Sequence, residues 1–509
     1  GVGGFARLWS DVDLFSASLT RDEAIDLYKS AEGQIHNGAI DPLVPFATYV
    51  GADSAQCRAN IDKMFGMHCA ILGSTGSGKS GAVAALLHSV LEHKPNGTDL
   101  CRPRIVILDP HGEYGQAFGE RAVVYRAYDP IGHEQAQGES IKLPYWLMSA
   151  DEFRSLAIGK TEFEATSQNN VIYKAMTYAR LVAAGLVNPS PTNYGGAAPV
   201  DGGNPDDPRP KEGVEAQAIV EFDRDKPRPF SLDEMINHIT YLQGARVSKT
   251  NTLERIPDGD FTKNFKSILD KLAILRRDPR INFLMANWDA DAPTLSEVLT
   301  QFISNPQTGD NKKKDIRILD ISGLPNEVAG PLAGMLARLL FQYKLYQTSD
   351  ERKKDPILLV CEEAHRYVPD RGEAEYATAQ IAIRRIAREG RKYGLSLMLV
   401  SQRPADVEST VISQCGTWLV LRLTNQADQQ HVARFLPDGL SGMTKVLPNL
   451  AQQEAIFVGE GASLPARVRI RNLTSHQLPR SQSAKFAEGW SSLGVSGAEL
   501  EAIVNRMVS

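Results

Sequence analysis

The stretch MHCAILGSTGSGKSGAVAALLHSVLEH, residues 67–93, decides the fold class. An apolar run from Cys69 to Leu72 meets a turn rich in glycine and serine, and a segment with apolar residues at helical spacing follows. The turn, Gly73 to Ser80, matches the pattern G-x-x-x-x-G-K-[ST] between a predicted strand and a predicted helix, which indicates a phosphate-binding loop. A chance glycine- and serine-rich loop is the weaker alternative, because both flanks fit.

Each residue type in this loop suits the binding of a nucleotide phosphate for a chemical reason. The glycines let backbone N–H groups curl around phosphate oxygens, and the helix N-terminus adds positive potential. We expect Lys79 to reach the β- and γ-phosphates of ATP, and the hydroxyl of Ser80 to bind Mg²⁺. The expected nucleotide-binding residues of the loop are Gly73, Ser74, Thr75, Gly76, Ser77, Gly78, Lys79, Ser80 and Gly81.

Further apolar runs predict more buried strands, with helix-like segments between them. They are Ile105 to Leu108, DIRILDISGLP at 315–325, Ile357 to Val360, a run from Leu395, and TWLVLRLT at 417–424. Strands that alternate with helices predict an α/β fold with a mostly parallel sheet and helices on both faces. QEAIFVGEG and LPARVRIRN, near the C-terminus, predict a terminal hairpin or an extension of the sheet edge.

The chain divides into five expected parts. They are an N-terminal piece (1–60), a first core part with the phosphate-binding loop (61–149), a helical insertion (150–305), a second core part (306–475) and a helical tail (476–509). Within the insertion, residues 188–213 are dense in glycine, proline and aspartate and poor in large apolar residues, which predicts a mobile surface loop.

Polar residues stand where the predicted strands end, which is where ligands bind in open parallel sheets. Glu362 and Glu363 follow the strand ILLV, and we expect Glu362 to hold the metal and Glu363 to polarise the attacking water. The alternative is a charged helix N-terminus, where acids are favoured anyway. Gln402 ends the next strand and can bind the γ-phosphate or the water, unless it is merely a polar loop residue.

A basic run precedes that last strand. Arg384, Arg388 and Arg391 share a helix face by their spacing, Arg385 lies one step round, and Lys392 follows. A guanidinium from a neighbouring subunit stabilises the charge on transferring phosphoryl oxygens in ring ATPases. Arg388 is the first candidate for this role and Arg391 the second; the alternative is a solvated basic face.

Composition excludes several classes of protein. With 42% apolar and 23% charged residues, the 509-residue chain is neither a disordered nor a collagen-like polymer. No run of about 18 apolar residues predicts a membrane helix, and the first residues do not form a secretory signal. Five scattered cysteines predict reduced thiols in a cytoplasmic protein. A net charge of -5 argues against a surface that coats nucleic acid, but not against a small basic channel.

The motifs together resemble one family. GSTGSGKS, ILDPHGEY, LDISGLP, VCEEAHRYVP and REGRKYGLSLMLVSQRP are similar to the HerA branch of the HerA/FtsK superfamily, and the match spans residues 67 to about 471. The acid pair here is Glu-Glu, where many relatives have Asp-Glu. GEGASLPARVRI also resembles the segment with which the family braces a neighbouring subunit.

The resemblance implies a RecA-like P-loop NTPase core in a homo-hexameric ring that moves double-stranded DNA through its channel with ATP and Mg²⁺. It implies that residues 1–60 are a shortened form of the family's β-barrel. It also implies that Asp109 or Glu113 contributes to the nucleotide site, against the alternative of a polar loop capped by Asp109. The implied partner is a NurA-type nuclease or a sirtuin-like or nuclease effector of antiphage defence.

Two other functions remain open from the sequence. In one, the ring is chiefly a scaffold that assembles an effector enzyme and uses ATP turnover for regulation. In the other, the same core remodels or secretes proteins. Stimulation of ATP hydrolysis by DNA distinguishes the translocase from the protein-remodelling ATPase, and a co-purifying effector identifies the scaffold.

Overall fold

The computed structural model describes most of the chain. The described residues are 21–32, 40–50, 52–128, 138–158, 166–190, 208–244, 246–247, 253–254, 265–286, 288, 292–303, 314–370, 377–435, 441–480, 486–491 and 494–508. Most of the loop predicted to be mobile, residues 191–207, lies outside them.

One large sheet organises the molecule. Its strands are β1 Leu43–Tyr49, β2 Ala52–Asn60, β3 Cys69–Leu72, β4 Ile105–Asp109, β5 Ala122–Arg126, β6 Glu139–Ser140, β9 Ile316–Asp320, β10 Ile357–Cys361, β11 Leu395–Ser401, β12 Thr417–Val420, β13 Glu454–Gly459 and β14 Ala466–Ile470. They lie in the order β2-β1-β14-β13-β12-β3-β11-β10-β4-β9-β5-β6. From β12 to β6 every neighbouring pair is parallel, which confirms the predicted α/β class. A separate two-stranded ribbon pairs β7 Arg246–Val247 with β8 Leu253–Glu254.

Helices cover both faces of the sheet. The helices are α3 Arg21–Glu32, α4 Ile61–Gly66, α5 Lys79–Glu92, α6 Ala150–Ile158, α7 Thr166–Ala183, α8 Ala216–Val220, α9 Leu232–Gly244, α11 Ser267–Arg277, α12 Asn282–Met285, α13 Leu295–Phe302, α14 Asn326–Leu345, α15 Ser349–Lys354, α16 Ala377–Tyr393, α17 Ser409–Ile412, α18 Gln426–Ala433, α19 Ser441–Thr444, α20 Phe486–Gly489 and α21 Gly497–Val508. Short 3₁₀ turns are η1 Gly119–Arg121, η2 Tyr145–Leu147, η4 Pro279–Ile281, η6 Ala364–Arg366, η8 Pro404–Asp406 and η10 Leu447–Asn449.

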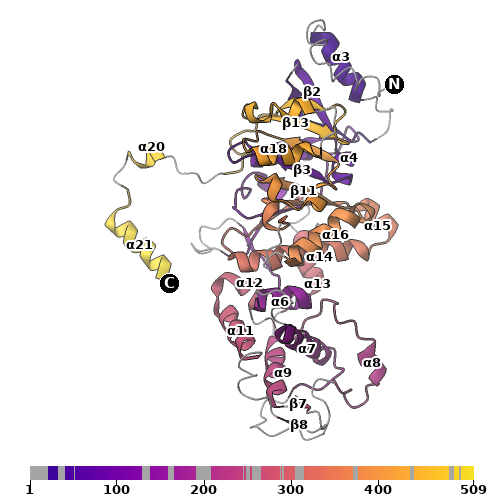
Figure 1. Cartoon of the computed structure of the whole chain (residues 1–509), viewed down its shortest axis with the longest axis vertical. Coiled ribbons are helices and arrows are strands. Elements are labelled where there is room, and N and C mark those ends of the chain that lie inside the picture. Colours follow the sequence, from indigo (N-terminus) through magenta and orange to yellow (C-terminus); the bar gives the residue numbers. More distant parts are fainter. Residues whose placement is uncertain are drawn as a thin grey trace.

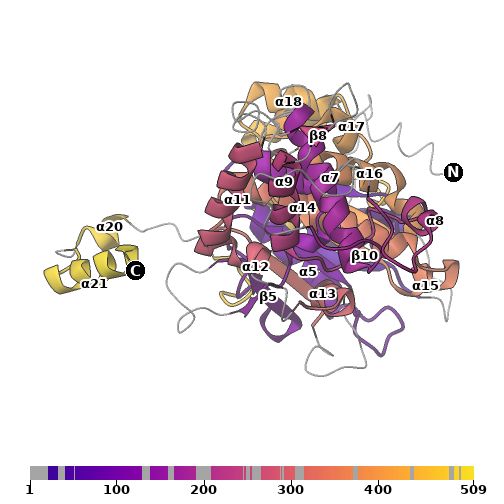
Figure 2. The ribbon, with the colours of Figure 1, turned by 90° about the horizontal axis from the view of Figure 1, so that it is seen from below.

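Two apolar cores result from this layering. Helix α5 packs on one face of the sheet, in a core with β3, β4 and β9 residues such as Ile71 and Ile107. Helices α14 and α16 pack on the other face, in a core that continues into α6, α7 and α9. Figure 1 shows α14 and α16 between the sheet and these helices, and the view from below in Figure 2 places α7, α9 and α11 in front of α14. No described helix is long and apolar enough to cross a membrane.

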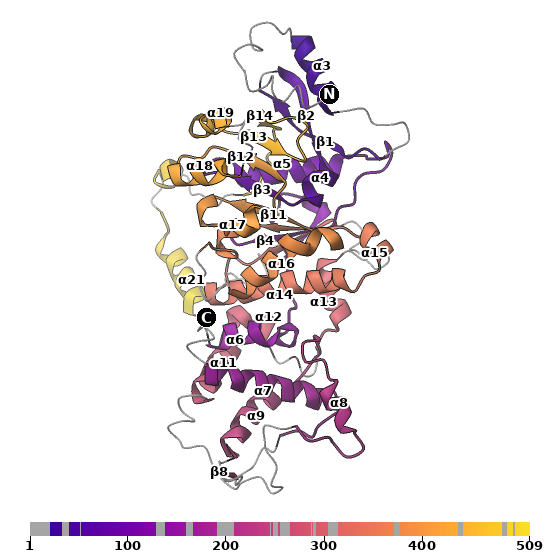
Figure 3. The ribbon, with the colours of Figure 1, turned by 45° about the vertical axis from the view of Figure 1, so that its right-hand side comes forward.

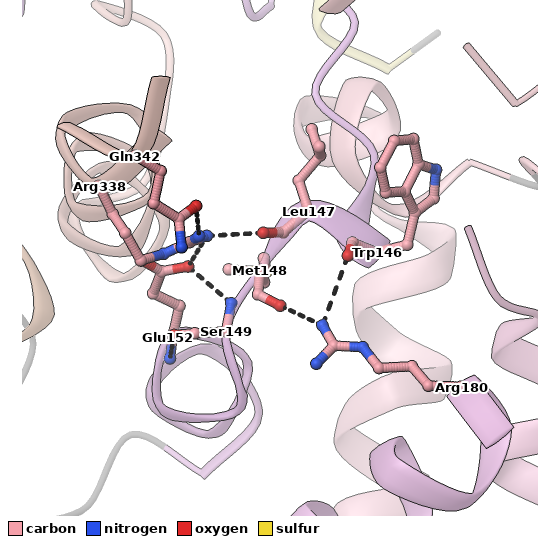
Figure 4. Close-up of polar contacts among 8 residues, drawn as sticks. All are labelled: Trp146, Leu147, Met148, Ser149, Glu152, Arg180, Arg338 and Gln342. Atoms are coloured by element: carbon pink, nitrogen blue, oxygen red, sulfur yellow. Dashed lines mark hydrogen bonds and ion pairs between the residues drawn. The ribbon is translucent and has the colours of Figure 1, made fainter. Parts of the chain in front are cut away.

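Arg338 of α14 and Arg180 of α7 attach the helices of segment 150–305 to α14 and to the turn η2. Arg338 of α14 donates to both carboxylate oxygens of Glu152 in α6, each at 2.7 Å, and to the carbonyl of Leu147 at 2.6 Å (Figure 4). Arg180 of α7 donates to the carbonyl of Met148 at 2.7 Å. Because Glu152 and Arg180 are 3% and 2% exposed, this clamp on the turn η2 is shielded from water.

The N-terminal strands, which lie in residues 1–60, the piece expected to be barrel-like, pair with the central sheet. In the described part of this segment, β1 pairs antiparallel with β14 and β2 pairs antiparallel with β1, so both strands extend the central sheet. The reason is a shared core: Phe46 is fully buried and its ring contacts Phe457 of β13 edge to face. Figure 3 shows β1, β2 and β14 together beyond β13 at this end of the sheet. The hairpin or edge extension predicted near the C-terminus is confirmed by the antiparallel pair of β13 and β14.

Candidate active site

The phosphate-binding loop joins β3 to α5, and its glycines are required by its shape. A Cβ on Gly73 would lie 2.5 Å from Ser77 Oγ and 2.9 Å from Leu421 Cβ. Gly76 and Gly78 have φ angles of +73° and +96°, which L side chains rarely adopt. The loop therefore keeps the open backbone that a phosphate needs.

The loop is tied to the two strands beside β3. The N–H of Gly73 donates to the carbonyl of Ser401 at 3.3 Å, and that of Ser74 donates to the carbonyl of Arg422 at 2.8 Å. The hydroxyl of Thr75 donates to Gln402 Oε1 at 2.5 Å. Gln402 is thus brought against the phosphate-binding loop, where the sequence predicts it.

Lys79 lies buried at the start of α5 and its Nζ donates to the carbonyl of Ser74 at 3.3 Å. Burial lowers the pKa of Lys79, and the carboxylates of Glu363, Glu362 and Glu113 partly offset that shift. The hydroxyl of Ser77 is buried and has no hydrogen-bond partner among the described residues. Among the described residues, the Ser77 hydroxyl is thus a buried donor without an acceptor in the same loop as Lys79.

Glu362 follows β10 and is buried beside the loop after β4. Its carboxyl accepts a hydrogen bond from the hydroxyl of Tyr114. Burial, together with the carboxylates of Asp109 and Glu363, raises the pKa of Glu362 to about 8 even though the Tyr114 hydroxyl lowers it. Tyr114 was not among the site residues predicted from the sequence. Its position in the motif ILDPHGEY, shortly after a buried strand, is the feature that could have indicated it.

Glu363 has a left-handed backbone conformation, with φ at +53°. Its carboxylate lies between two histidines: Oε2 is 3.3 Å from His365 Nδ1, and Oε1 is 3.8 Å from His111 Nε2. Neither histidine received a role from the sequence. An unusual backbone conformation held at a candidate catalytic residue is a common feature of active sites.

Asp109 and Glu113 flank the acid pair in different ways. Asp109 accepts hydrogen bonds from the N–H groups of His111 at 3.2 Å and Tyr114 at 2.9 Å, so it caps its own loop. Burial raises the pKa of Asp109 to about 6. This geometry matches the alternative of a capping aspartate. The negative charge of Glu113 raises the pKa of Lys79. The backbone carbonyl of Glu113 accepts a hydrogen bond from the N–H of Arg480 at 2.9 Å.

The oxygen donors fit a Mg²⁺ ion that is shared with a nucleotide. Within the described ranges no three His, Cys, Asp or Glu side chains converge as a metal site. Mg²⁺ is commonly bound by one or two protein oxygens together with substrate phosphates and waters. The hydroxyl of Ser80 and the buried carboxyl of Glu362, whose pKa is raised by burial, suit that arrangement.

The arginines of α16 divide into paired and unpaired ones. Arg384 donates to both oxygens of Glu408 at 2.8 and 2.9 Å, and Arg385 stacks 4.4 Å above the ring of Phe341. Arg388 and Arg391 are exposed, and neither guanidinium makes a hydrogen bond or ion pair with a described residue. The two sequence candidates are therefore the available guanidinium groups of the shared face.

Arg388 lies far from the phosphate-binding loop of its own chain. Its neighbour Ala387 accepts a hydrogen bond at its carbonyl from His68 Nε2 at 3.1 Å, and His68 immediately precedes β3. The phosphate-binding loop follows the opposite end of β3, about 13 Å away at roughly 3.3 Å per residue over four residues. The site and Arg388 thus lie at opposite edges of the sheet.

Fold and site together define a RecA-like P-loop NTPase. Residues 48–340 match the family described as "Helicase HerA, central domain", more than half of the chain, and the protein belongs to that family. It is a HerA-like ATPase of the HerA/FtsK superfamily.

One relative in sequence agrees with this assignment, and two solved structures have a similar fold. The chain is 24% identical to the probable DNA double-strand break repair helicase HerA of Methanocaldococcus jannaschii, over 82% of this chain and 74% of the relative. Its fold is similar to that of VirB4 of Thermoanaerobacter pseudethanolicus, with a TM-score of 0.51, 15% identity, and coverage of 87% of this chain and 99% of that one. It is also similar to the plasmid coupling protein TrwB in complex with ADP and Mg²⁺, with a TM-score of 0.51, 15% identity, and coverage of 89% and 94%.

Proposed function

We propose that this ATPase is a HerA-type DNA translocase that hydrolyses ATP with Mg²⁺ as a hexameric ring. The helices of segment 150–305 form an inserted subdomain in this proposal, and the tail from 476 onward lies outside the core. Family membership supports the proposal, as does the relative named as a DNA double-strand break repair helicase.

The roles of the chain's own residues follow from their positions. The backbone of the phosphate-binding loop and Lys79 bind the phosphates, while Ser80 and Glu362 hold the metal. Mg²⁺, when bound, neutralises negative charge on the β- and γ-phosphate oxygens. Glu363 polarises the attacking water, and Gln402 senses the γ-phosphate from the neighbouring strand end.

The separation of Arg388 from its own phosphate-binding loop is the observation that carries the ring proposal. A guanidinium at the opposite edge of the sheet assists catalysis only in a neighbouring subunit. A head-to-tail contact between identical subunits brings the two edges together, and closed rings are built from such contacts. Arg391 is the second candidate on the same helix.

DNA binding in this proposal is confined to the ring's channel. With a net charge of -5, the chain does not favour DNA over its whole surface, so phosphate contacts concentrate in a local basic lining. Affinity then falls steeply with salt and depends little on base sequence. The outer faces stay free for an effector protein, such as a NurA-type nuclease or a sirtuin-like enzyme of antiphage defence.

The test measures ATP hydrolysis with and without linear duplex DNA, at low and moderate salt, alone and with a candidate effector. Stimulation by DNA that weakens as salt rises supports the translocase. Hydrolysis that is indifferent to DNA under every condition contradicts it and favours the scaffold function, especially if an effector co-purifies.

A further inference from the structure

A line of polar contacts runs along the carboxyl ends of three adjacent strands, β3, β11 and β10. The hydroxyl of Thr75, which follows β3, donates a hydrogen bond to the side chain of Gln402, which follows β11. Ser401 Oγ, at the end of β11, lies 3.2 Å from Nδ1 of His365, which follows β10. The same Nδ1 lies 3.3 Å from Glu363 Oε2. The site's acid and the phosphate-binding loop are therefore linked through β11.

We infer that His365 is a positioning residue that holds the Glu363 carboxylate and couples its orientation to the carboxyl end of β11. The inference rests on the proposed function, because it assumes that Glu363 polarises the attacking water. It gives a role in catalysis to His365, which belongs neither to the acid pair nor to the phosphate-binding loop.

Glu363 needs such a partner. Its left-handed backbone fixes where the side chain starts, but not where the carboxylate points. Glu363 Oε2 is buried and receives no hydrogen bond from any described residue, and His365 Nδ1 lies within ion-pair distance of it. His111 approaches the other oxygen only to 3.8 Å, and its side chain is 50% exposed. His365, at 17%, is the more shielded partner.

The link to β11 depends on one nitrogen that two oxygens can reach. A neutral imidazole Nδ1 carries either a proton or a lone pair, so it serves Glu363 or Ser401 but not both in the same way. When Ser401 donates its hydroxyl proton to Nδ1, the ring cannot donate to Glu363. Ser401 Oγ also accepts from the N–H of Arg403 at 3.1 Å. This bond ties the Ser401 hydroxyl to the backbone on the far side of Gln402, whose side chain contacts the phosphate-binding loop.

The experiment compares His365→Ala, His365→Asn and His111→Asn in the full chain, with kcat and KM for ATP, nucleotide binding and thermal midpoint. We expect His365→Ala to lower kcat by about tenfold to a hundredfold, as misplacement of a reacting group does, with KM unchanged. Asparagine carries an amide nitrogen near the position of Nδ1, so His365→Asn recovers most of the loss. His111→Asn tests the longer contact, at 3.8 Å, and lowers kcat less than His365→Ala does.

A second variant tests the coupling to β11. Ser401→Ala lowers kcat less than His365→Ala, and the double variant is no worse than His365→Ala alone, since residues that act as a unit are not additive. If His365→Ala does not fold, the kcat-against-KM comparison for Ser401→Ala carries the test.

The inference is overturned if His365→Ala keeps the wild-type kcat, raises KM in place of lowering kcat, or is not improved by asparagine. Additive losses in the double variant overturn the coupling to β11. A wild-type chain without ATPase activity overturns the proposed function as well. Activity that depends on Glu363 but not on His365 overturns this inference alone.

Discussion

At the scale of single residues, the acid pair contains two carboxyl groups in contrasting environments. Glu362 is buried and accepts a hydrogen bond from the hydroxyl of Tyr114. Glu363 has a left-handed backbone, and its carboxylate lies near two histidines. A left-handed conformation at a non-glycine residue costs about 1–3 kcal/mol and persists only where the surroundings impose it. In the proposed function, the enclosed acid, Glu362, binds the metal and Glu363 activates the water.

Replacement of Glu363 tests the second of these roles. Glu363→Gln keeps the size of the side chain and removes its basicity, so we expect ATP to bind normally and to turn over at least about 10²-fold more slowly. Lys79→Ala should abolish hydrolysis because it removes the positive charge on the phosphates. Steady-state rates and fluorescent-nucleotide binding check both, with the exposed Glu120→Gln as control. Normal hydrolysis by Glu363→Gln would mean that the acid pair is wrongly assigned.

The enclosed acid makes stability depend on pH. Burial raises the pKa of Glu362 from 4.5 to about 8, so between these values the folded chain keeps a proton that the unfolded chain has released. Stability from this group is therefore lost as pH rises from about 4.5 to about 8. Glu362→Gln should raise the thermal midpoint of the nucleotide-free protein at pH 8, with little difference at pH 5, while lowering ATPase activity. An equal or lower midpoint at pH 8 would contradict the burial argument.

At the scale of elements, the clamp between α14 and α6 should matter more than exposed ion pairs. Arg338→Met leaves Glu152 buried without its partner, which costs about 3–5 kcal/mol. The double change with Glu152→Leu should recover most of this loss. Thermal midpoints and hydrogen exchange in α6 measure both. Lys271→Met breaks the exposed Lys271–Glu327 pair at 3.0 Å and should cost under about 1 kcal/mol. Equal losses for Arg338→Met and Lys271→Met would contradict the clamp.

The central strands could be predicted from the sequence, whereas others, such as β2 and β5, could not. Runs such as CAIL and ILLVC are buried on both faces, so continuous apolar residues indicate them directly. Strand β2, ADSAQCRAN, alternates buried and more exposed positions, but its inward residues Ala55, Cys57 and Ala59 are too small to stand out. Strand β5, AVVYR, follows closely on the turn η1 and was not singled out.

The candidate site was predictable where a motif fixes the geometry, as in the phosphate-binding loop and the acids after β10. Contacts between strands were not, because they depend on the order β3-β11-β10-β4. The Tyr114–Glu362 bond and the approach of His365 to Ser401 both cross that order. Helical spacing likewise grouped Arg384 with Arg388 but could not reveal that Glu408 binds Arg384.

At the scale of the whole molecule, the sheet separates the candidate catalytic groups into two edges. Lys79, Glu362 and Glu363 lie at the carboxyl ends of the parallel strands, while Arg388 lies near the start of β3 and β11. In the proposed ring, a single chain presents one half of a composite site at each edge. ATP hydrolysis in that ring therefore requires two neighbouring subunits, because each supplies part of the site.

Mixing two inactive variants tests that division directly. Lys79→Ala retains Arg388, and Arg388→Ala retains the phosphate-binding loop, so one orientation of the mixed interface is fully wild type. In a random equal mixture about a quarter of the head-to-tail interfaces have this orientation, and some ATPase activity should return. Lys392→Ala, an exposed change on the same helix, is the control that should keep activity. Light scattering establishes assembly in each sample. A monomeric chain with full activity, or mixed rings as inactive as the separate variants, would contradict a site completed by the neighbour, because each chain then works or fails with its own residues alone.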